Sequence, residues 1–168
     1  MNWIGFLENF VWFGCAALGF AILFNVPKRT LISTFLMASF GGTVKLLILH
    51  WNNSIILGTL VGAVIIGFLS IYAAHFRHSP PVVFAIPAVI PMVPGSFAYN
   101  TMKGIIRLTN NTGTADFVEL LRDTVTNGLM TLFVLMAIAV GVVAPMLITR
   151  RDSAKQIKIS LPHHTKQD

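Results

Sequence analysis

The chain has 168 residues, of which 55% are hydrophobic and only 11% are charged, whereas about a quarter of the residues of a soluble domain are charged. This composition excludes a soluble globular domain and predicts an integral membrane protein. The net charge of +6 comes from basic residues that lie between apolar segments or in the C-terminal tail. That distribution fits membrane topology better than nucleic-acid binding, and the single cysteine, Cys15, excludes an internal disulfide.

Apolar segments predict an all-α polytopic fold with about five transmembrane helices, because about twenty apolar residues suffice to cross the hydrocarbon core. The transmembrane domain is expected over residues 1–148, and a basic cytoplasmic tail over 149–168. The expected spans are 3–24, 30–51, 55–76, 82–107 (broken by prolines) and 124–148.

The first span has no basic flank before it and is too long for a cleaved signal peptide, so we expect it to be retained. Glu8 lies within two turns of the start, which favours a headgroup position over a proton-coupling role. Pro27 ends this span, and Lys28 and Arg29 indicate a cytoplasmic turn.

The second span contains Lys45 well inside its apolar run. A lysine at this depth must snorkel or be paired, so snorkelling and anion binding both remain open. Gly41 and Gly42 in the same span allow a close helix approach. In the third span, Gly58 and Gly62 lie four residues apart and predict a face that packs closely against a neighbouring helix.

The fourth span is apolar, yet it contains Pro87, Pro91 and the pair Pro94-Gly95. Interior prolines remove helix hydrogen bonds, so no continuous helix is expected here. In hydrocarbon such a break is tolerated only where protein or a water-filled cavity surrounds it, and broken helices are typical of transporter binding sites. We interpret the break as a substrate gate or site; the alternative is a kinked helix that binds no ligand.

After the break, Ser96, Tyr99, Asn100 and Lys103 follow at i, i+3, i+4 and i+7, which places them along one helix face. This polar stripe could bind a carboxylate-bearing solute, although ordinary inter-helix hydrogen bonding and interface snorkelling explain it equally well. The predicted substrate-binding or gating residues are Pro91, Pro94, Gly95, Ser96, Tyr99, Asn100, Lys103 and Lys45.

The fifth span is preceded by an expected N-cap, Asp116, with Glu119 three residues later. Glu119, Arg122 and Asp123 are expected in solvated first turns; the minor alternative is that Asp123 or Glu119 lines the entrance and couples a proton. The basic tail that follows is expected to contact anionic lipid.

Basic residues indicate the topology. If the tail is cytoplasmic, eight of the twelve basic residues share that side, and the N-terminus lies outside. These eight are Lys28, Arg29, Arg77, Arg150, Arg151, Lys155, Lys158 and Lys166. An odd number of spans is what an inverted half of a two-part transporter requires, so a second copy or a related subunit is expected.

Three blocks then suggest a family: FNVPKR at 24–29, HSPPVVF at 78–84 and AVIPMVPGSFAYNTM at 88–102. They resemble the small subunit of the bacterial threonine/serine exporter family, most closely the small subunit of the two-component enterobacterial succinate exporter. The resemblance implies efflux of succinate-like dicarboxylates or threonine/serine across the inner membrane with a larger partner subunit. Pro91, Pro94, Gly95 and Tyr99 match the motif.

A different class of function is an accessory membrane subunit that stabilises or places a partner without contacting substrate. A membrane enzyme is the weakest reading, because the sequence offers no Ser-His-Asp or Cys-His set, no intramembrane carboxylate pair and no metal-ligand cluster. No catalytic residue, metal or cofactor is therefore expected. The chain also lacks a nucleotide-binding P-loop, so the energy for transport must come from a gradient or another chain.

Overall fold

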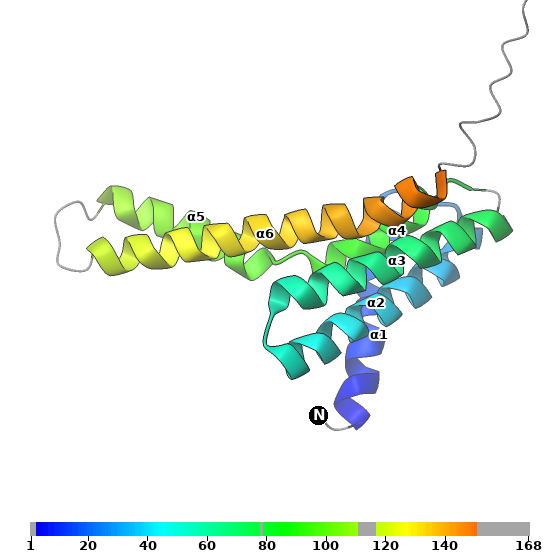
Figure 1. Cartoon of the computed structure of the whole chain (residues 1–168), viewed down its shortest axis with the longest axis horizontal. Coiled ribbons are helices and arrows are strands. Elements are labelled where there is room, and N and C mark those ends of the chain that lie inside the picture. The colour runs from blue at the N-terminus through cyan, green and yellow to red at the C-terminus, as the bar shows by residue number, and fades with distance from the viewer. Residues whose placement is uncertain (1–2, 78, 111–116, 151–168) are drawn as a thin grey trace, which may run out of the picture.

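The computed structural model describes residues 3–77, 79–110 and 117–150, and every regular element in those ranges is helical (Figure 1). This confirms the predicted all-α fold. In chain order the elements are α1 (Trp3–Leu23), the 3-10 turn η1 (Lys28–Thr30), α2 (Leu31–Asn52), α3 (Ile55–Arg77), α4 (Pro81–Val89), the 3-10 turn η2 (Ile90–Met92), α5 (Gly95–Asn110) and α6 (Phe117–Arg150).

Four helical stretches in the described residues are long and apolar enough to cross a membrane: Gly5–Leu23, Lys28–Asn52, Ile55–Arg77 and Phe117–Thr149. The α4–η2 stretch and α5 form a bent pair at 59°, which makes a fifth span if the pair crosses as one unit. The predicted broken fourth helix is thus confirmed. Asp116, His78 and the tail beyond Arg150 lie outside the described residues.

The last helix is longer than its predicted span. The expected span of 124–148 is the later part of α6, which begins at Phe117, directly after the expected N-cap Asp116, and contains 34 residues. At 1.5 Å per residue it is about 51 Å long, compared with about 30 Å for the hydrocarbon core. The helix continues into the polar turns because Glu119, Arg122 and Asp123 are exposed and need no apolar neighbour.

Two asparagines end the first two long helices. Asn25 and Asn53 have φ values of 54° and 50°, in the left-handed region that asparagine tolerates better than most residues. The Asn53 N–H donates to the Leu49 carbonyl at 3.0 Å, which caps α2. Only Asn53 and Ser54 therefore separate α2 from α3.

Glycines bring α2 and α3 into close contact. A Cβ atom on Gly58 would lie 2.7 Å from the Lys45 carbonyl oxygen, and one on Gly62 would lie 2.7 Å from the Gly41 carbonyl oxygen. Real Cβ contacts are essentially never this short, so only glycine permits the observed approach. The predicted packing face of α3 is confirmed.

On its opposite side α3 packs against α6, and glycines again permit the close approach. A Cβ atom on Gly67 would lie 3.0 Å from the Val142 carbonyl oxygen, and one on Gly141 would lie 3.0 Å from the Leu60 carbonyl oxygen. Helix α3 therefore packs between α2 and α6, and its Ile66 side chain is fully buried and lies against Gly41 of α2.

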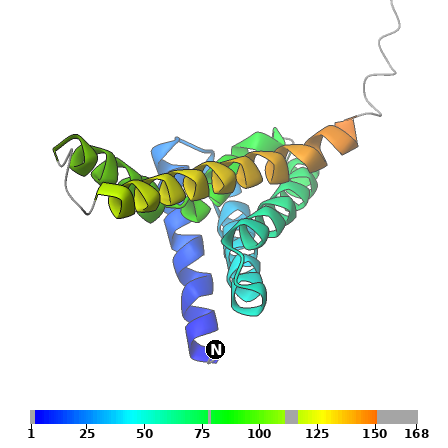
Figure 2. The same ribbon diagram turned by 60° about the vertical axis from the view of Figure 1, so that its left-hand side comes forward.

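Helix α5 and residues 117–130 of α6 extend away from the other helices (Figure 1), and we call this pair the arm. The only extensive neighbour of α5 in the described part of the chain is α6. Gly104 of α5 is buried against Thr124 of α6. Figure 2 shows α1 standing steeply to α6.

The chain connections gather at two ends of the molecule. Residues 24–27, which join α1 to α2, line one cavity with residues 82–87 at the start of α4. Arg77, at the end of α3, lines a groove with Ser33 of α2, and the last turns of α3 line another with Thr149 of α6. The two basic connections and the end of α6 therefore lie at the same end of the bundle.

Candidate functional site at the helix break

The break between α4 and α5 is a short run of tight turns. Pro91 and Pro94 have no N–H to donate. Instead the Val93 N–H donates to the Ile90 carbonyl at 3.0 Å, and the Gly95 N–H donates to the Val93 carbonyl at 2.9 Å. The prolines thus interrupt the ordinary helical ladder and turn the chain by 59° before α5 begins.

Lys45 bonds directly to this break. Its ammonium Nζ donates to the Met92 carbonyl oxygen at 2.8 Å, and the two residues are 47 positions apart in the sequence. The Met92 side chain is fully buried, and Lys45 is half-buried. Every other side-chain hydrogen bond among the described residues joins positions no more than four apart. This bond therefore has no counterpart elsewhere in the described fold.

The bond gives a partner to two polar groups, each of which would be costly to bury without one. A lysine deep in an apolar segment needs an acceptor, and a carbonyl at a proline break needs a donor. Because an ammonium has three N–H donors, Lys45 can serve the Met92 carbonyl and still offer two donors to water or a solute. Sequence reasoning left snorkelling and anion binding open for Lys45; the structure adds a carbonyl partner, and anion binding stays a prediction.

The glycine face of α3 supports this arrangement. A Cβ atom on Gly62 would lie 3.0 Å from the Met92 Cε atom and 3.4 Å from the Lys45 Cβ atom. Gly62 thus lets Lys45 and the break approach α3 together. Sequence reasoning identified Gly62 as a packing residue but gave no signal for Met92, since a backbone carbonyl carries no residue-type pattern.

The predicted polar stripe lies on an exposed face of α5. Ser96, Tyr99, Asn100 and Lys103 are all exposed, with Tyr99 at 67%. The residues of α5 that pack against α6 form a neighbouring face and are buried or half-buried: Phe97, Thr101, Gly104 and Leu108. Within the part of the chain that the structure describes, the stripe is therefore open beside α6.

The eight predicted site residues fall into two groups. Pro91, Pro94, Gly95 and Lys45 meet at the break, with Ser96 in the first turn that follows. Tyr99, Asn100 and Lys103 lie farther along α5. Lys103 is eight residues beyond Gly95, which corresponds to about 12 Å along the helix. The structure thus places Lys45 at the break and Lys103 out along the arm.

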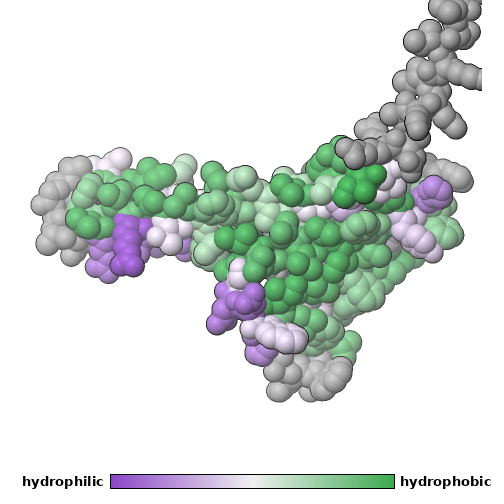
Figure 3. Space-filling model, in the orientation of Figure 1, coloured by the Kyte–Doolittle hydropathy of each residue, from purple (hydrophilic) through white to green (hydrophobic). Residues whose placement is uncertain are grey.

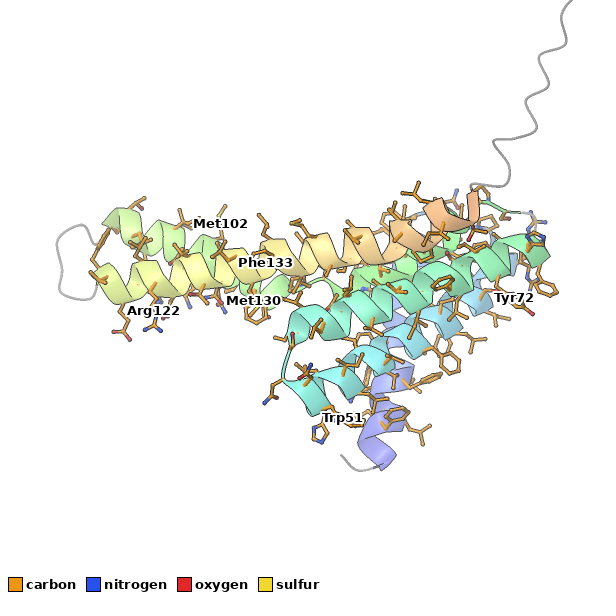
Figure 4. All side chains as sticks on the ribbon, viewed as in Figure 1. Trp51, Tyr72, Met102, Arg122, Met130 and Phe133 are labelled. Carbon is orange, nitrogen blue, oxygen red and sulfur yellow. The ribbon has the colours of Figure 1, made fainter. Side chains whose placement is uncertain are left out.

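The arm has a polar side and an apolar side. Figure 4 places Arg122 and Met102 on opposite sides of it, and Figure 3 shows hydrophilic residues along the side that carries Arg122. Glu119, Arg122 and Asp123 are all exposed, in agreement with the predicted solvated turns. A proton-coupling role for Glu119 or Asp123 stays a prediction.

Comparison with known proteins places these features in a family. The family described as "Threonine/Serine exporter, ThrE" matches residues 9–148, which include the break, Lys45 and the polar stripe. An uncharacterized protein of Haemophilus influenzae is 33% identical over 136 residues. The aligned region is 81% of this chain but 45% of that relative, so the chain spans less than half of the relative's length. No solved structure matches the chain.

Proposed function

The chain belongs to the threonine/serine exporter family, and from this premise we propose that it is a subunit of an exporter of small carboxylates in the bacterial inner membrane. The substrate is a succinate-like dicarboxylate or threonine/serine. A larger subunit of the same family completes the transporter. The multi-pass helical architecture and membership of a membrane exporter family support transport as the general role.

The bond from the Lys45 ammonium to the Met92 carbonyl is the observation that carries this proposal. It puts a cation with spare donors at the point where the membrane helix is broken. A substrate carboxylate can accept those donors, and charge-assisted hydrogen bonds of this kind are stronger than neutral ones. Lys45 thus binds the carboxylate at the break.

The start of α5 adds to the same site. The N-terminal end of a helix carries a partial positive charge, which favours an anion next to Gly95 and Ser96. Tyr99 and Asn100 follow on the exposed stripe and supply hydroxyl and amide groups for hydrogen bonds to the substrate. Lys103 provides a second cation farther along the route.

The exposed polar stripe also supports a partner. Polar and charged groups at membrane depth are costly when they face lipid, and they usually face protein or a water-filled cavity. Among the described residues only α6 packs extensively on α5, and these residues leave the stripe uncovered. We propose that the larger subunit covers this stripe and closes the site from the other side.

Efflux of labelled succinate and labelled threonine tests the proposal. Cells would express this chain alone, the larger subunit alone, or both, and the loss of label from preloaded cells would be followed. We expect efflux only when both chains are present, and the faster solute identifies the substrate class. Absence of efflux with both chains would contradict the proposal and favour the accessory role.

Two variants separate a substrate site from an accessory role. A Cβ atom on Gly95 would meet nothing within 4 Å, and Tyr99 is 67% exposed, so Gly95→Ala and Tyr99→Phe should leave the fold and the complex intact. We expect both to lower efflux. Gly19→Ala is the control, because a Cβ atom there also meets nothing within 4 Å and the position lies far along the chain in α1. Loss of co-purification without a specific efflux defect would favour the accessory subunit.

A further inference from the structure

A groove with a volume of about 600 Å³ lies between the start of α2 and the end of α3, within the size range of small-molecule sites. Because the two helices run antiparallel, Ser33 and Arg77 belong to one end of the groove, and Phe40 and Leu69 belong to the other. The groove is therefore polar at one end and apolar at the other. No residue of the proposed export site lines it.

The walls of the groove are apolar and open to the side. Leu36 and Phe40 of α2 are 45% and 53% exposed, and Tyr72 and Phe76 of α3 are 65% and 68% exposed. The Tyr72 and Phe76 rings pack together with their centroids 4.8 Å apart. Figure 4 shows Tyr72 projecting from α3 near its C-terminal end, away from the arm. Such a surface in a membrane protein suits an acyl chain.

The polar end of the groove is cationic. Arg77 lines it directly, and Arg29 precedes Ser33 by four residues, in the turn η1 that leads into α2; both arginines are exposed. The sequence has no aspartate or glutamate in residues 24–40 or 65–77. Arginine matches a phosphate group with two parallel N–H donors. The charge at this end is therefore complementary to a phosphate head group.

We propose that this groove binds one anionic phospholipid, with an acyl chain along Leu36, Phe40, Tyr72 and Phe76 and the phosphate at Arg77 and Arg29. Basic pockets between membrane helices are known to bind anionic head groups, and tyrosine is common at the membrane interface. A free phosphate would leave the apolar wall uncovered, which is why a lipid is the better occupant. The inference depends on the multi-pass membrane architecture and is independent of the exported solute.

Native mass spectrometry of the purified full chain tests this site. The chain would be mixed with dioleoyl phosphatidylglycerol or with dioleoyl phosphatidylethanolamine, which has the same acyl chains but no net charge. We expect preferential retention of the anionic lipid. One arginine near a membrane surface contributes about 1 kcal/mol, so Arg77→Gln and Arg29→Gln should each weaken retention about fivefold.

Two further variants complete the test: one is a charge control, and the other fills the groove. Arg107→Gln removes the same charge from the exposed surface of the arm and should leave lipid retention unchanged. Leu36→Trp fills the groove at a position with space around it and should reduce retention of the anionic lipid even if an arginine variant does not fold. Glycerol phosphate, which is a head group without an acyl chain, should not displace the bound lipid.

Several outcomes would overturn the proposal. Equal retention of the two lipids, or an equal loss in Arg107→Gln and Arg77→Gln, would mean that the groove does not select an anionic head group. Displacement by glycerol phosphate would show a phosphate site without acyl-chain recognition. A dimer that loses its stability in Leu36→Trp and retains no lipid would identify a second copy of the chain as the occupant.

Discussion

At the scale of single residues, Lys45 and Met92 explain why a charged side chain and a broken backbone occur in one membrane domain. Each group alone would be costly in hydrocarbon. Their hydrogen bond, at 2.8 Å, gives the carbonyl a donor and holds the ammonium at the break. The binding proposal follows from this pair, since a substrate carboxylate can accept the two donors that the Met92 carbonyl leaves free.

Replacing Lys45 with methionine should destabilise the protein. The change keeps a long apolar stem but leaves the Met92 carbonyl without the donor that the structure shows. Loss of such a bond typically costs about 1–3 kcal/mol of unfolding free energy. Thermal unfolding in detergent, followed by circular dichroism, would measure the change, and Lys45→Arg should lose less because a guanidinium still donates.

Lys28→Met is the matched control for that experiment, because Lys28 is exposed in η1. It should unfold at the parent temperature. If Lys45→Met were as stable as the parent chain, the bond to Met92 would contribute nothing to the fold.

At the scale of elements, α3 is the helix against which the others are placed. Its glycines bring it against α2 on one side and against α6 on the other. In lipid there is little hydrophobic force between helices, so association depends on this close packing. The same contacts support the break, because Met92 packs where Gly62 leaves space.

Gly62→Ala should therefore disturb the close contact between α2 and α3. The new methyl group would lie 2.7 Å from the Gly41 carbonyl oxygen and 3.0 Å from the Met92 Cε atom, and a backbone atom cannot move away cheaply. Overpacking of this kind typically costs about 1–3 kcal/mol. The thermal unfolding temperature in detergent would report the loss.

Gly19→Ala provides the comparison, since its Cβ atom meets nothing within 4 Å and alanine favours a helix more than glycine does. That variant should be as stable as the parent or slightly more so. Equal stability of Gly62→Ala and Gly19→Ala would refute the close contact at Gly62.

At the scale of the whole molecule, the connections between the helices lie at two opposite ends of the bundle. The α1–α2 and α3–α4 connections lie at the end where α6 finishes, and the α2–α3 turn lies near the opposite end. Lys28, Arg29 and Arg77 are at the first end. Because basic residues are enriched on the cytoplasmic side of membrane proteins, we expect this end to face the cytoplasm.

Cysteine labelling would test this orientation. In a Cys15→Ser background, Asn53→Cys should react with a membrane-impermeant maleimide in intact cells, and Lys28→Cys should react only after the membrane is permeabilised. Both positions are exposed in the structure, so access by the reagent is not limited by burial. Labelling of both positions from the same side would contradict the topology.

The sequence by itself determined the features that depend on local chemistry. Its composition indicated a membrane protein, its apolar runs marked the spans, and the expected N-cap at Asp116 with polar first turns marked the start of α6 at Phe117. The prolines predicted the break because they lack a donor, and the spacing of Gly58 and Gly62 predicted a packing face because the helical period is fixed.

Only the tertiary structure decided which distant groups meet. Nothing in the sequence pairs Lys45 with a backbone carbonyl 47 residues later, since every carbonyl looks alike in a sequence. The way the helices cross likewise determines how far Lys45 lies from Lys103, where the arm extends, and where the groove beside Arg77 forms. Crossing geometry arises from many side chains and backbone atoms that fit together at once, whereas a break or a cap arises from one short segment.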